Sequence, residues 1–425
     1  MPPHSIPLLS PAELAYLYTS LASYPHNPIR SDGRSATQFR SLSAETGILP
    51  GANGSARIGF ADGTQAIVGV KAEVERTVKE GVVDWGAEEE DSQDQDESDV
   101  DVAGAGQERR KKRRRCGESS WVEMSIEIPG VRDDDSLPVY LAEMMRETIV
   151  SAENGTAGVG GSGAGSAEAA SVDTPRSLRE RLVINGGWHW RLYIDILLLS
   201  PPLSYPLPLL SLTTHLALLS TKLPRLISKD EEDPMFDDDW AAAEWLYPRP
   251  ASTTTTSKLR SKQSIPFRPP VTLLVVSVGE NVIFDPTQDE ISVADAVFAI
   301  SVVSDTSLPT TGQGQEQERA PLKLISIRTI DPPARMTNHG VLNSENPAFP
   351  NVSQGGEEKG TLALGTGAGV TVMKSEESKA VVDGVWKPRT GGVKRGVISR
   401  IVKMVVKKGG VGEEVLRGLE MVDVE

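Results

Sequence analysis

Four charged side chains lie along one short alternating segment of this sequence, GSARIGFADGTQAIVGVKAEVE at residues 54–75. Arg57 and Lys71 have the chemistry to bind phosphate groups, and Glu73 and Glu75 have the chemistry to bind a metal ion or to transfer protons. Apolar residues alternate with polar ones on both sides of the central Asp-Gly pair, which predicts a β-hairpin that turns there. The charges therefore form an active site, a contact surface, or only the solvated face of a sheet.

Other residues with catalytic potential are sparse. The five histidines form no metal-spaced cluster such as HExxH, so neither a zinc enzyme nor any other metal site is expected. His189 lies between two tryptophans at the start of an alternating segment, which favours a structural role over that of a general base. The glycine runs at 158–165 and 365–369 contain G-x-G spacings, but neither lies between a clear strand and a clear helix. We expect linkers there and no cofactor.

The composition is that of an acidic chain with much irregular sequence. It has 425 residues, a formal net charge of −15, 39 glycines and 29 prolines. A negative charge argues against a generic polyanion binder, although much of the acid is confined to one block. The single cysteine, Cys116, allows neither an internal disulfide nor a cysteine-based zinc site. No apolar run approaches the roughly 20 residues that span a bilayer, and we expect a soluble, reduced, intracellular protein.

The elements that must position any site fall into two successive groups. In the first, the periodicity predicts helices and strands in the order helix 13–21, hairpin 56–74, strand 121–128, helix 139–150, strand 188–199 and helix 209–219. In the second, it predicts strands over 271–278, 282–285, 293–303 and 322–330 and then a basic amphipathic helix over 396–408. Two units of sheet plus helix follow one another, which indicates a repeated α+β architecture.

Low-complexity stretches interrupt these elements. An acidic block at 84–101 and a basic run at 109–115 lie inside a predicted disordered insertion, 82–120. The basic run is either a nuclear-localisation signal or the counter-charge of the acidic block, and both readings stay open. Further insertions are predicted at about 151–175, 305–319 and 334–369. A low-complexity linker at 227–268 then separates a first domain, 27–226, from a second, 269–425.

A series of motifs in fixed order resembles the RNase PH-like family. They are RSDGR at 30–34, ET at 45–46, GSARI, the Asp-Gly turn, IVGVKAEVE, WRLYIDILLLS at 190–200, LALLSTKLPRL at 216–226 and VIFDPTQDE at 282–290. The resemblance covers roughly 27–226 and 269–303, and we expect it to extend to the C-terminal helix. It implies an α+β fold of two βαβα-type halves, of the ribosomal protein S5 domain 2-like type. It also implies a ring of six such subunits, as in the RNA exosome, with single-stranded RNA threading the channel.

The same resemblance offers a test for catalysis. Active members bind the attacking phosphate in a GGTRTA-like turn before a helix, and ungapped counting from LPRL places SYPLPLL, 204–210, at that turn. Pro206 occupies the expected arginine position, and prolines lack the N–H groups of an anion site. Active members also carry two acids six residues apart. Asp285 fits the first position but Ile291 the second, unless a one-residue slip places Glu290 there. The resemblance thus implies a vestigial acid at Asp285 and no catalytic residues.

We therefore predict a non-catalytic ring subunit of the RNA exosome core, which scaffolds the hexameric ring and lines the channel in 3′-to-5′ RNA processing and degradation, including ribosomal RNA maturation. The implied partners are other RNase PH-like subunits, RNA-binding cap subunits and single-stranded RNA, with no membrane. Arg30, Arg34, Arg57 and Lys71 are candidates for contacts with RNA or a neighbouring chain, each with the alternative of a plain surface charge. The rival functions are an active phosphate-dependent 3′-to-5′ exoribonuclease and a sister inactive ring subunit of the 45 or 43 type. The expected location is nucleus and nucleolus, and also cytoplasm.

Overall fold

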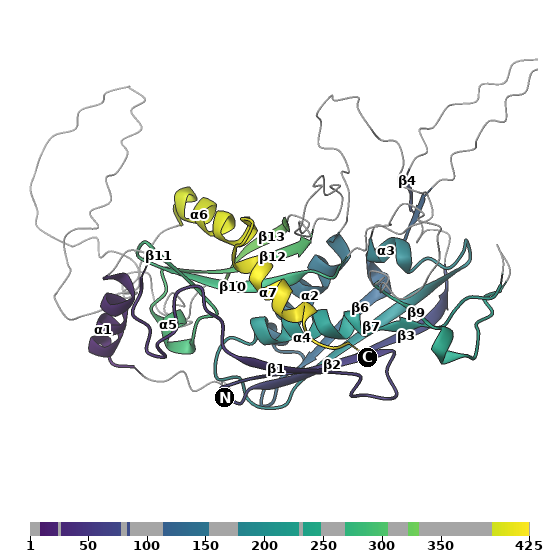
Figure 1. Ribbon diagram of the computed structural model, residues 1–425, viewed down its shortest axis with the longest axis horizontal. Coiled ribbons are helices and arrows are strands. Elements are labelled where there is room, and N and C mark those ends of the chain that lie inside the picture. Colours follow the sequence, from purple (N-terminus) through teal and green to yellow (C-terminus); the bar gives the residue numbers. More distant parts are fainter. Residues whose placement is uncertain are drawn as a thin grey trace, which may run out of the picture. The chain divides into compact units, whose positions relative to one another are not determined.

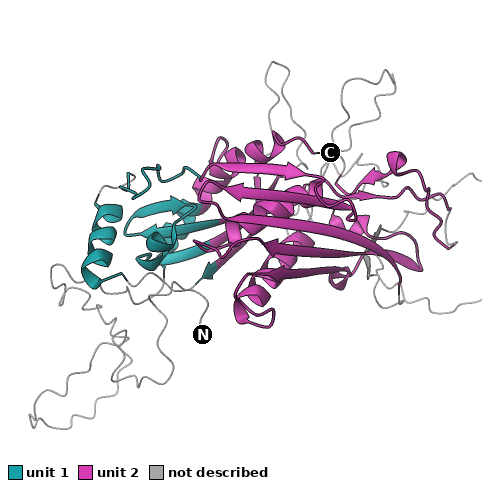
Figure 2. Cartoon of the chain, turned by 90° about the horizontal axis from the view of Figure 1, so that it is seen from below, with its two compact units in different colours: residues 1–39, 274–298, 329–401 teal, residues 40–273, 299–328, 402–425 magenta. Residues whose placement is uncertain are grey.

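The structure is a computed structural model, and it forms two compact units (Figure 2). Unit 1 comprises residues 1–39, 274–298 and 329–401, and unit 2 comprises residues 40–273, 299–328 and 402–425. The described residues are 9–23, 27–77, 83–85, 114–152, 177–228, 233–247, 268–304, 322–330 and 393–424. The domain boundaries expected from the sequence divide the chain differently and stay a prediction. The predicted insertions at 305–319 and 334–369, and that at 151–175 beyond Ala152, lie outside the described residues.

A five-stranded sheet is the centre of unit 2 (Figure 1). Its strands lie in the order β1-β2-β3-β7-β6, and every neighbouring pair is antiparallel except β6 and β7, which are parallel. Their bounds are β1 Leu42–Thr46, β2 Gly54–Phe60, β3 Gln65–Arg76, β6 Val122–Glu127 and β7 Trp188–Leu198. The predicted hairpin is confirmed as β2 and β3, and the sequence did not indicate the edge strand β1.

The hairpin turns where the Asp-Gly pair predicted it. Gly63 has φ +89°, a left-handed conformation that glycine adopts without a steric penalty. The side chain of Asp62 accepts hydrogen bonds from the backbone N–H and the hydroxyl of Thr64, which fixes the turn. Because side chains alternate between faces, Ala66, Val68 and Val70 are fully buried on one face and the charged residues point to the other.

Two helices cover the apolar face of this sheet (Figure 1). Helix α4, Leu207–Leu219, packs on β2 and β3, and helix α2, Ser136–Ser151, packs on β6. All 13 residues of α4 are buried, and nine of them are apolar, as expected for a helix enclosed in a core. The start of β2 approaches α4 so closely that a Cβ on Gly54 would lie 2.6 Å from the backbone nitrogen of Thr221. Unit 2 also holds α3, Leu178–Arg181, and a C-terminal helix α7, Val411–Glu420, that the sequence did not indicate.

A second sheet has the strand order β11-β10-β12-β13. Its strands are β10 Val271–Val278, β11 Asn281–Phe284, β12 Ala296–Ser304 and β13 Leu322–Ile330, and the first two form an antiparallel hairpin. Strands β10 and β11 are buried along their whole length, which explains their continuous apolar runs. The strand predicted from Val293 begins at Ala296 instead, because Thr287 caps a short helix, α5 Gln288–Ser292, that Val293 ends.

The remaining elements complete the two units. In unit 1, helix α1, Pro11–Ala22, packs against α5, and α6, Arg395–Val406, is the predicted basic helix, which crosses into unit 2 after Ile401. In unit 2, β4, Val83–Trp85, pairs antiparallel with β5, Arg114–Cys116. The predicted disordered insertion 82–120 therefore contains a strand near each end, and its interior, 86–113, lies outside the described residues. Among the helices that the structure describes, none is both long and apolar enough to cross a membrane.

Candidate functional site

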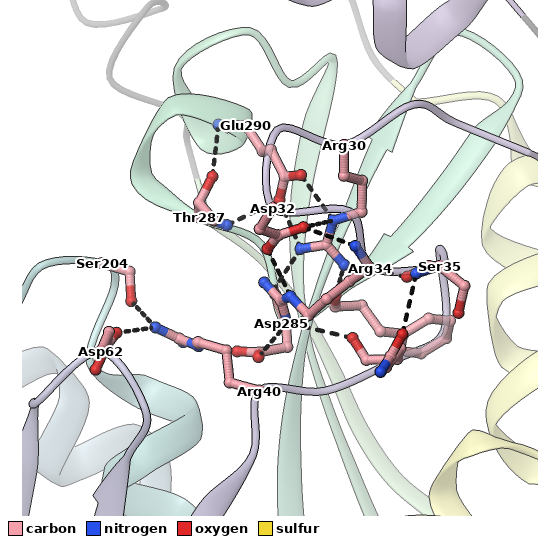
Figure 3. Close-up of polar contacts among 12 residues, drawn as sticks. Arg30, Asp32, Arg34, Ser35, Arg40, Asp62, Ser204, Asp285, Thr287 and Glu290 are labelled. Atoms are coloured by element: carbon pink, nitrogen blue, oxygen red, sulfur yellow. Dashed lines mark hydrogen bonds and ion pairs between the residues drawn. The ribbon is translucent and has the colours of Figure 1, made fainter.

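Two arginines and three carboxylates gather in unit 1 at the place of the predicted vestigial acid (Figure 3). We call Arg30, Asp32, Arg34, Asp285 and Glu290 the arginine–carboxylate cluster. The first three come from the RSDGR loop that follows α1, Asp285 follows β11 directly, and Glu290 lies in α5. Two of the four basic candidates and the predicted acidic position therefore lie together.

Local sequence chemistry explains how Glu290 reaches this place. Thr287 is the N-cap of α5, and its hydroxyl accepts a hydrogen bond from the Glu290 N–H. The Glu290 carboxylate in turn accepts a hydrogen bond from the Thr287 N–H at 2.8 Å, which completes a capping box. The T-x-x-E spacing in PTQDE is the signal for this arrangement. It fixes the carboxylate of Glu290 next to the guanidinium of Arg30.

The ion pair between Arg30 and Glu290 is fully buried. Arg30 Nε and Nη2 donate to the two oxygens of Glu290 at 2.8 and 2.9 Å, and the two side chains are 0% and 2% exposed. Arg30 Nη1 donates to the carbonyls of Ser35 and Phe284, and Nη2 also donates to the carbonyl of Asp285. These bonds use all five N–H groups of a guanidinium. An RNA phosphate could bind Arg30 only by displacing one of these partners.

Arg34 links the other two carboxylates of the cluster. Its Nε donates to Asp32 Oδ2 at 2.5 Å, and its Nη1 donates to Asp285 Oδ2 at 2.7 Å. Burial by itself would raise the pKa of Asp32, but hydrogen bonds from the backbone and guanidinium of Arg34 and the charge of Arg30 outweigh it. The pKa of Asp32 is therefore held below its ordinary value. Arg34 itself is 10% exposed, so its guanidinium is mostly enclosed.

Asp285 has an uncommon backbone conformation. Its φ is +47°, the one positive φ of a non-glycine residue in the described chain, and its side chain is fully buried. Aspartate tolerates the left-handed region better than most residues, and such a conformation persists where surrounding contacts hold it. Here Arg30 and Arg34 both donate to its carbonyl, Arg34 also binds its carboxylate, and its N–H donates to Leu274. Asp285 is thus a junction that organises the loop around it.

The chemical consequence is that the carboxylates of Asp285 and Glu290 are both neutralised by arginines. A carboxylate that binds a divalent metal or transfers a proton needs a free lone pair on the reacting side. Asp285 and Glu290 direct carboxylate oxygens to guanidinium groups instead. Among the described residues, no group of three or more His, Cys, Asp or Glu side chains has the arrangement of a metal site.

In unit 2, the segment aligned with the phosphate-binding turn is apolar and rich in proline. Pro206 is the N-cap residue of α4, and Pro208 lies in its first turn, so two of the N–H groups that a helix start normally offers to an anion are missing. Arg40, which the sequence did not single out, reaches this segment and donates to Ser204 Oγ at 2.8 Å (Figure 3). The same Nη1 of Arg40 binds Asp62 at 2.6 Å, and the guanidinium lies 4.4 Å from the centre of the Phe60 ring.

The other two basic candidates lie on the outer face of the five-stranded sheet. Arg57 Nη2 donates to Gln65 Oε1 at 2.6 Å, and Lys71 pairs with Glu73 at 3.1 Å with 61% of its side chain exposed. Glu75 binds Arg191 at 3.0 Å. All four charged residues of the opening hairpin share this face, opposite to the helices. Arg57 and Lys71 belong to unit 2, whereas Arg30 and Arg34 belong to unit 1.

Sequence reasoning missed two parts of this arrangement. The pairing of Arg30 with Glu290 joins residues 260 positions apart, and no local pattern reports such a contact. The T-x-x-E spacing at 287–290 is a local signal for the start of α5, which the sequence analysis did not predict. Arg40 carries no motif, and the segment it reaches was judged by its missing arginine and by its prolines.

Comparisons with known proteins support the resemblance. No family model matches the chain. It is 30% identical over 298 residues to exosome complex component RRP42 of Saccharomyces cerevisiae, covering 69% of this chain and 81% of that protein. It is 26% identical over 313 residues to exosome complex component rrp42 of Schizosaccharomyces pombe, covering 72% and 84%.

Solved structures of similar chains come from the same kind of assembly. One is a chain of the Archaeoglobus fulgidus exosome with RNA bound to the active site, with 17% identity, a TM-score of 0.42, and coverage of 75% of this chain and 86% of that one. Another is an archaeal exosome core chain, with 16% identity, a TM-score of 0.39, and coverage of 75% and 84%. The sequence relationship to the yeast protein spans most of both chains, and so this chain belongs to the RRP42 family of exosome complex components.

Proposed function

We propose that this chain is a non-catalytic ring subunit of the RNA exosome core, of the ribosomal RNA processing protein 42 type. In this role it scaffolds the hexameric RNase PH-like ring and lines the RNA channel in 3′-to-5′ RNA processing and degradation, including ribosomal RNA maturation. Membership of a family whose named relatives are exosome complex components supports the assignment to this assembly. The proposed partners are the other RNase PH-like subunits, the RNA-binding cap subunits and single-stranded RNA.

One observation carries the non-catalytic part of the proposal. Asp285, at the first expected acidic position, and Glu290, one residue before the second, are each bound to an arginine, at 2.7 and 2.8 Å, with almost no solvent exposure. Phosphorolysis needs a carboxylate that is free to hold a metal ion or to assist the leaving oxygen. Freeing Glu290 would leave the buried guanidinium of Arg30 without its bidentate partner, which costs several kcal/mol.

The segment 204–210 supports the same conclusion independently. Phosphate binding at a helix start depends on free N–H groups and on basic side chains that converge there. Pro206 and Pro208 remove two of those N–H groups, and Arg40 already binds Asp62 and Ser204. A phosphate ion would have to compete with a carboxylate for this one arginine.

An active phosphate-dependent exoribonuclease is the alternative that one observation favours. Such an enzyme requires arginine or lysine donors near Asp285, and Arg30 and Arg34 do lie there. All N–H groups of Arg30 are occupied, however, and Arg34 binds two carboxylates and the Gln38 carbonyl. We therefore assign these arginines to holding the loop and not to binding phosphate.

Copurification tests the proposed assembly. A tagged chain expressed at its natural level in its own cells is expected to bring down the other five RNase PH-like subunits and the cap subunits in near-equal amounts. A sister subunit of the 45 or 43 type would occupy a different ring position, which cross-linking of ring neighbours distinguishes. Recovery of the chain without any exosome subunit would contradict the proposal.

We also propose that the protein is located in the nucleus and nucleolus as well as in the cytoplasm. The basic run at 109–115 supports nuclear entry by its charge, and most of it lies outside the described residues. Replacing its lysines and arginines with glutamine is expected to shift a fluorescent fusion toward the cytoplasm. An unchanged distribution would show that the run only balances the acidic block at 84–101.

A further inference from the structure

A second acidic region of unit 2 has no part in the proposed function. We define the acidic hairpin as residues 222–228 and 233–245. At its base, Lys222–Leu223 (β8) pairs antiparallel with Glu244–Trp245 (β9). Further out, Leu226 and Phe236 form a bridge, and the Ile227 N–H donates to the Met235 carbonyl at 2.8 Å. These bonds show that the segment predicted as a low-complexity linker holds an ordered arm between 233 and 245.

One face of the arm is anchored and the other is open. The Phe236 ring packs against Trp190, with ring centres 4.9 Å apart. Because Leu226 lies opposite Phe236, the next cross-strand pair, Ile227 and Met235, points to the other side. These two side chains are 56% and 66% exposed among the described residues.

A tryptophan follows in the same arm. Trp240, 49% exposed, begins a 3-10 helix, η3 Trp240–Ala242, whose N-cap Asp239 accepts a hydrogen bond from the Ala241 N–H at 2.9 Å. Asp237 in turn accepts a hydrogen bond from the Asp239 N–H at 3.1 Å. The two aspartates therefore fix the turn that presents Trp240. Less of the conformational entropy of this loop is lost on binding when the turn is already formed.

Acidic side chains surround these apolar ones. The described residues 225–228 and 233–240 contain four aspartates against one basic residue, Arg225. Asp238 is exposed and makes no hydrogen bond or ion pair with any described residue. Trp240 is a residue type that dominates binding energy at protein interfaces, and Ile227 and Met235 add apolar area beside the acids. The acids would repel RNA phosphates and anionic lipids, which leaves a protein surface as the occupant.

We propose that the acidic hairpin docks a protein partner whose surface offers an apolar pocket to Met235 and Trp240 within a rim of lysine or arginine. Burial of the two side chains supplies affinity, and the aspartates supply selectivity and a faster encounter. This inference goes beyond the ring function, since neither ring assembly nor the loss of catalysis invokes the arm.

Site-specific photo-cross-linking tests the docking surface. The full chain carries p-benzoylphenylalanine in place of Met235 in one version and in place of Met421 in a matched control, because Met421 is 75% exposed elsewhere in unit 2. Irradiation of cells is expected to give one dominant cross-linked protein from position 235 and not from position 421. Mass spectrometry should place the cross-link on a peptide that contains lysine or arginine.

Charge variants then decide whether the acids take part. Asp238→Lys is expected to lower the yield of this product at least about fivefold, and it breaks no hydrogen bond or ion pair with a described residue. Glu127→Lys, an exposed reversal on β6, is expected to leave the yield unchanged. The proposal is overturned by no specific product from position 235, the same product from position 421, or a product on nucleic acid or on a peptide without basic residues. It is equally overturned by a yield that Asp238→Lys does not change. The proposed ring function is tested separately: it fails if the unmodified tagged chain does not copurify with the exosome subunits.

Discussion

The arginine–carboxylate cluster of unit 1 and the outer sheet face of unit 2 contain the same kinds of side chain in opposite environments. In the cluster, the side chains of Arg30 and Glu290 are 0% and 2% exposed and every donor of the arginine is used. On the sheet face, the side chains of Lys71 and Glu73 are 61% and 51% exposed and make one ion pair. A basic and an acidic residue thus form a buried structural junction in unit 1 and a solvated ion pair on the sheet face of unit 2.

The difference shows which charges are available to a partner. A buried pair is hard to open, because each ion left behind is desolvated and unpaired. An exposed pair contributes at most about 1 kcal/mol and exchanges with water freely. Lys71 and Arg57 are therefore the residues we expect to contact RNA or a neighbouring subunit, whereas we assign Arg30 and Arg34, candidates for the same contacts, to holding their loop.

The largest expected effect comes from breaking the buried pair. Glu290→Ala should lower the free energy of unfolding by about 3–5 kcal/mol, because Arg30 stays buried without its bidentate carboxylate and keeps the longer contact to Asp32 at 3.7 Å. Urea unfolding followed by fluorescence measures this loss. Glu73→Ala, the same substitution on the sheet face, serves as the control and should change the free energy by less than about 0.5 kcal/mol. Equal losses in the two variants would erase the distinction between the regions.

A double substitution sharpens the reading of that result. Arg30→Met combined with Glu290→Leu removes both charges together and should be clearly less destabilising than Glu290→Ala alone. The physical reason is that the single variant leaves a buried cation without its bidentate partner, whereas the double variant leaves no cation at position 30. A double variant at least as unstable as the single one would assign the effect to packing instead of charge.

Burial without an ion pair predicts a dependence on pH. Burial in α4 lowers the pKa of His215 to about 4, from 6.5. Above pH 6.5, His215 is neutral in both the folded and the unfolded chain. Between pH 6.5 and about 4, His215 is protonated in the unfolded chain but stays neutral in the folded chain. Stability should therefore fall between pH 6.5 and about 4, by about 3 kcal/mol in all. His215→Leu should remove most of this slope. Burial also lowers the pKa of His189, and this residue should account for the slope that remains. An unchanged slope in His215→Leu would contradict the assignment.

A smaller effect is expected at the strained junction. Asp285→Ala should destabilise by about 1 kcal/mol more than Asp285→Asn, because asparagine tolerates a φ of +47° and alanine does not. Both variants remove the charge that Arg34 binds, and asparagine alone keeps an oxygen that can accept a hydrogen bond from Arg34, so their difference combines the backbone term with that bond. Thermal or urea unfolding of the two variants provides the comparison, and equal stabilities would show that the backbone relaxes at this residue.

The smallest effect on stability belongs to the outer sheet face. Arg57→Gln with Lys71→Gln should leave the free energy of unfolding within about 0.5 kcal/mol of the original chain. In the assembled exosome core, the same pair should weaken single-stranded RNA binding about threefold at low salt and reduce the salt dependence. Fluorescence anisotropy at several salt concentrations measures both. Unchanged RNA affinity at low salt would remove these residues from the RNA path and leave contact with a neighbouring subunit.

The sequence was sufficient for most of the fold but not for the cluster. Alternation and turn chemistry predicted β2 and β3 around Gly63, and the apolar run predicted β10, because both signals are local. Strand β1, Leu42–Thr46, was not predicted, because an exposed edge strand has little apolar alternation. The pairing of Arg30 with Glu290 escaped because it depends on how distant segments fold together. The position of Asp285 was predicted from a motif. Its burial and its bonds to Arg30 and Arg34 are properties of the tertiary structure.

Phosphate-dependent release of nucleoside diphosphates from a single-stranded RNA tests the central claim most directly. We expect the purified chain, and the assembled core in which this chain is the varied subunit, to show no release that depends on Asp285 or Glu290. Asp285→Asn in the core should therefore leave the rate unchanged once assembly is shown to be intact. Phosphorolysis by the purified chain that Asp285→Asn abolishes, while the chain stays folded, would contradict the account.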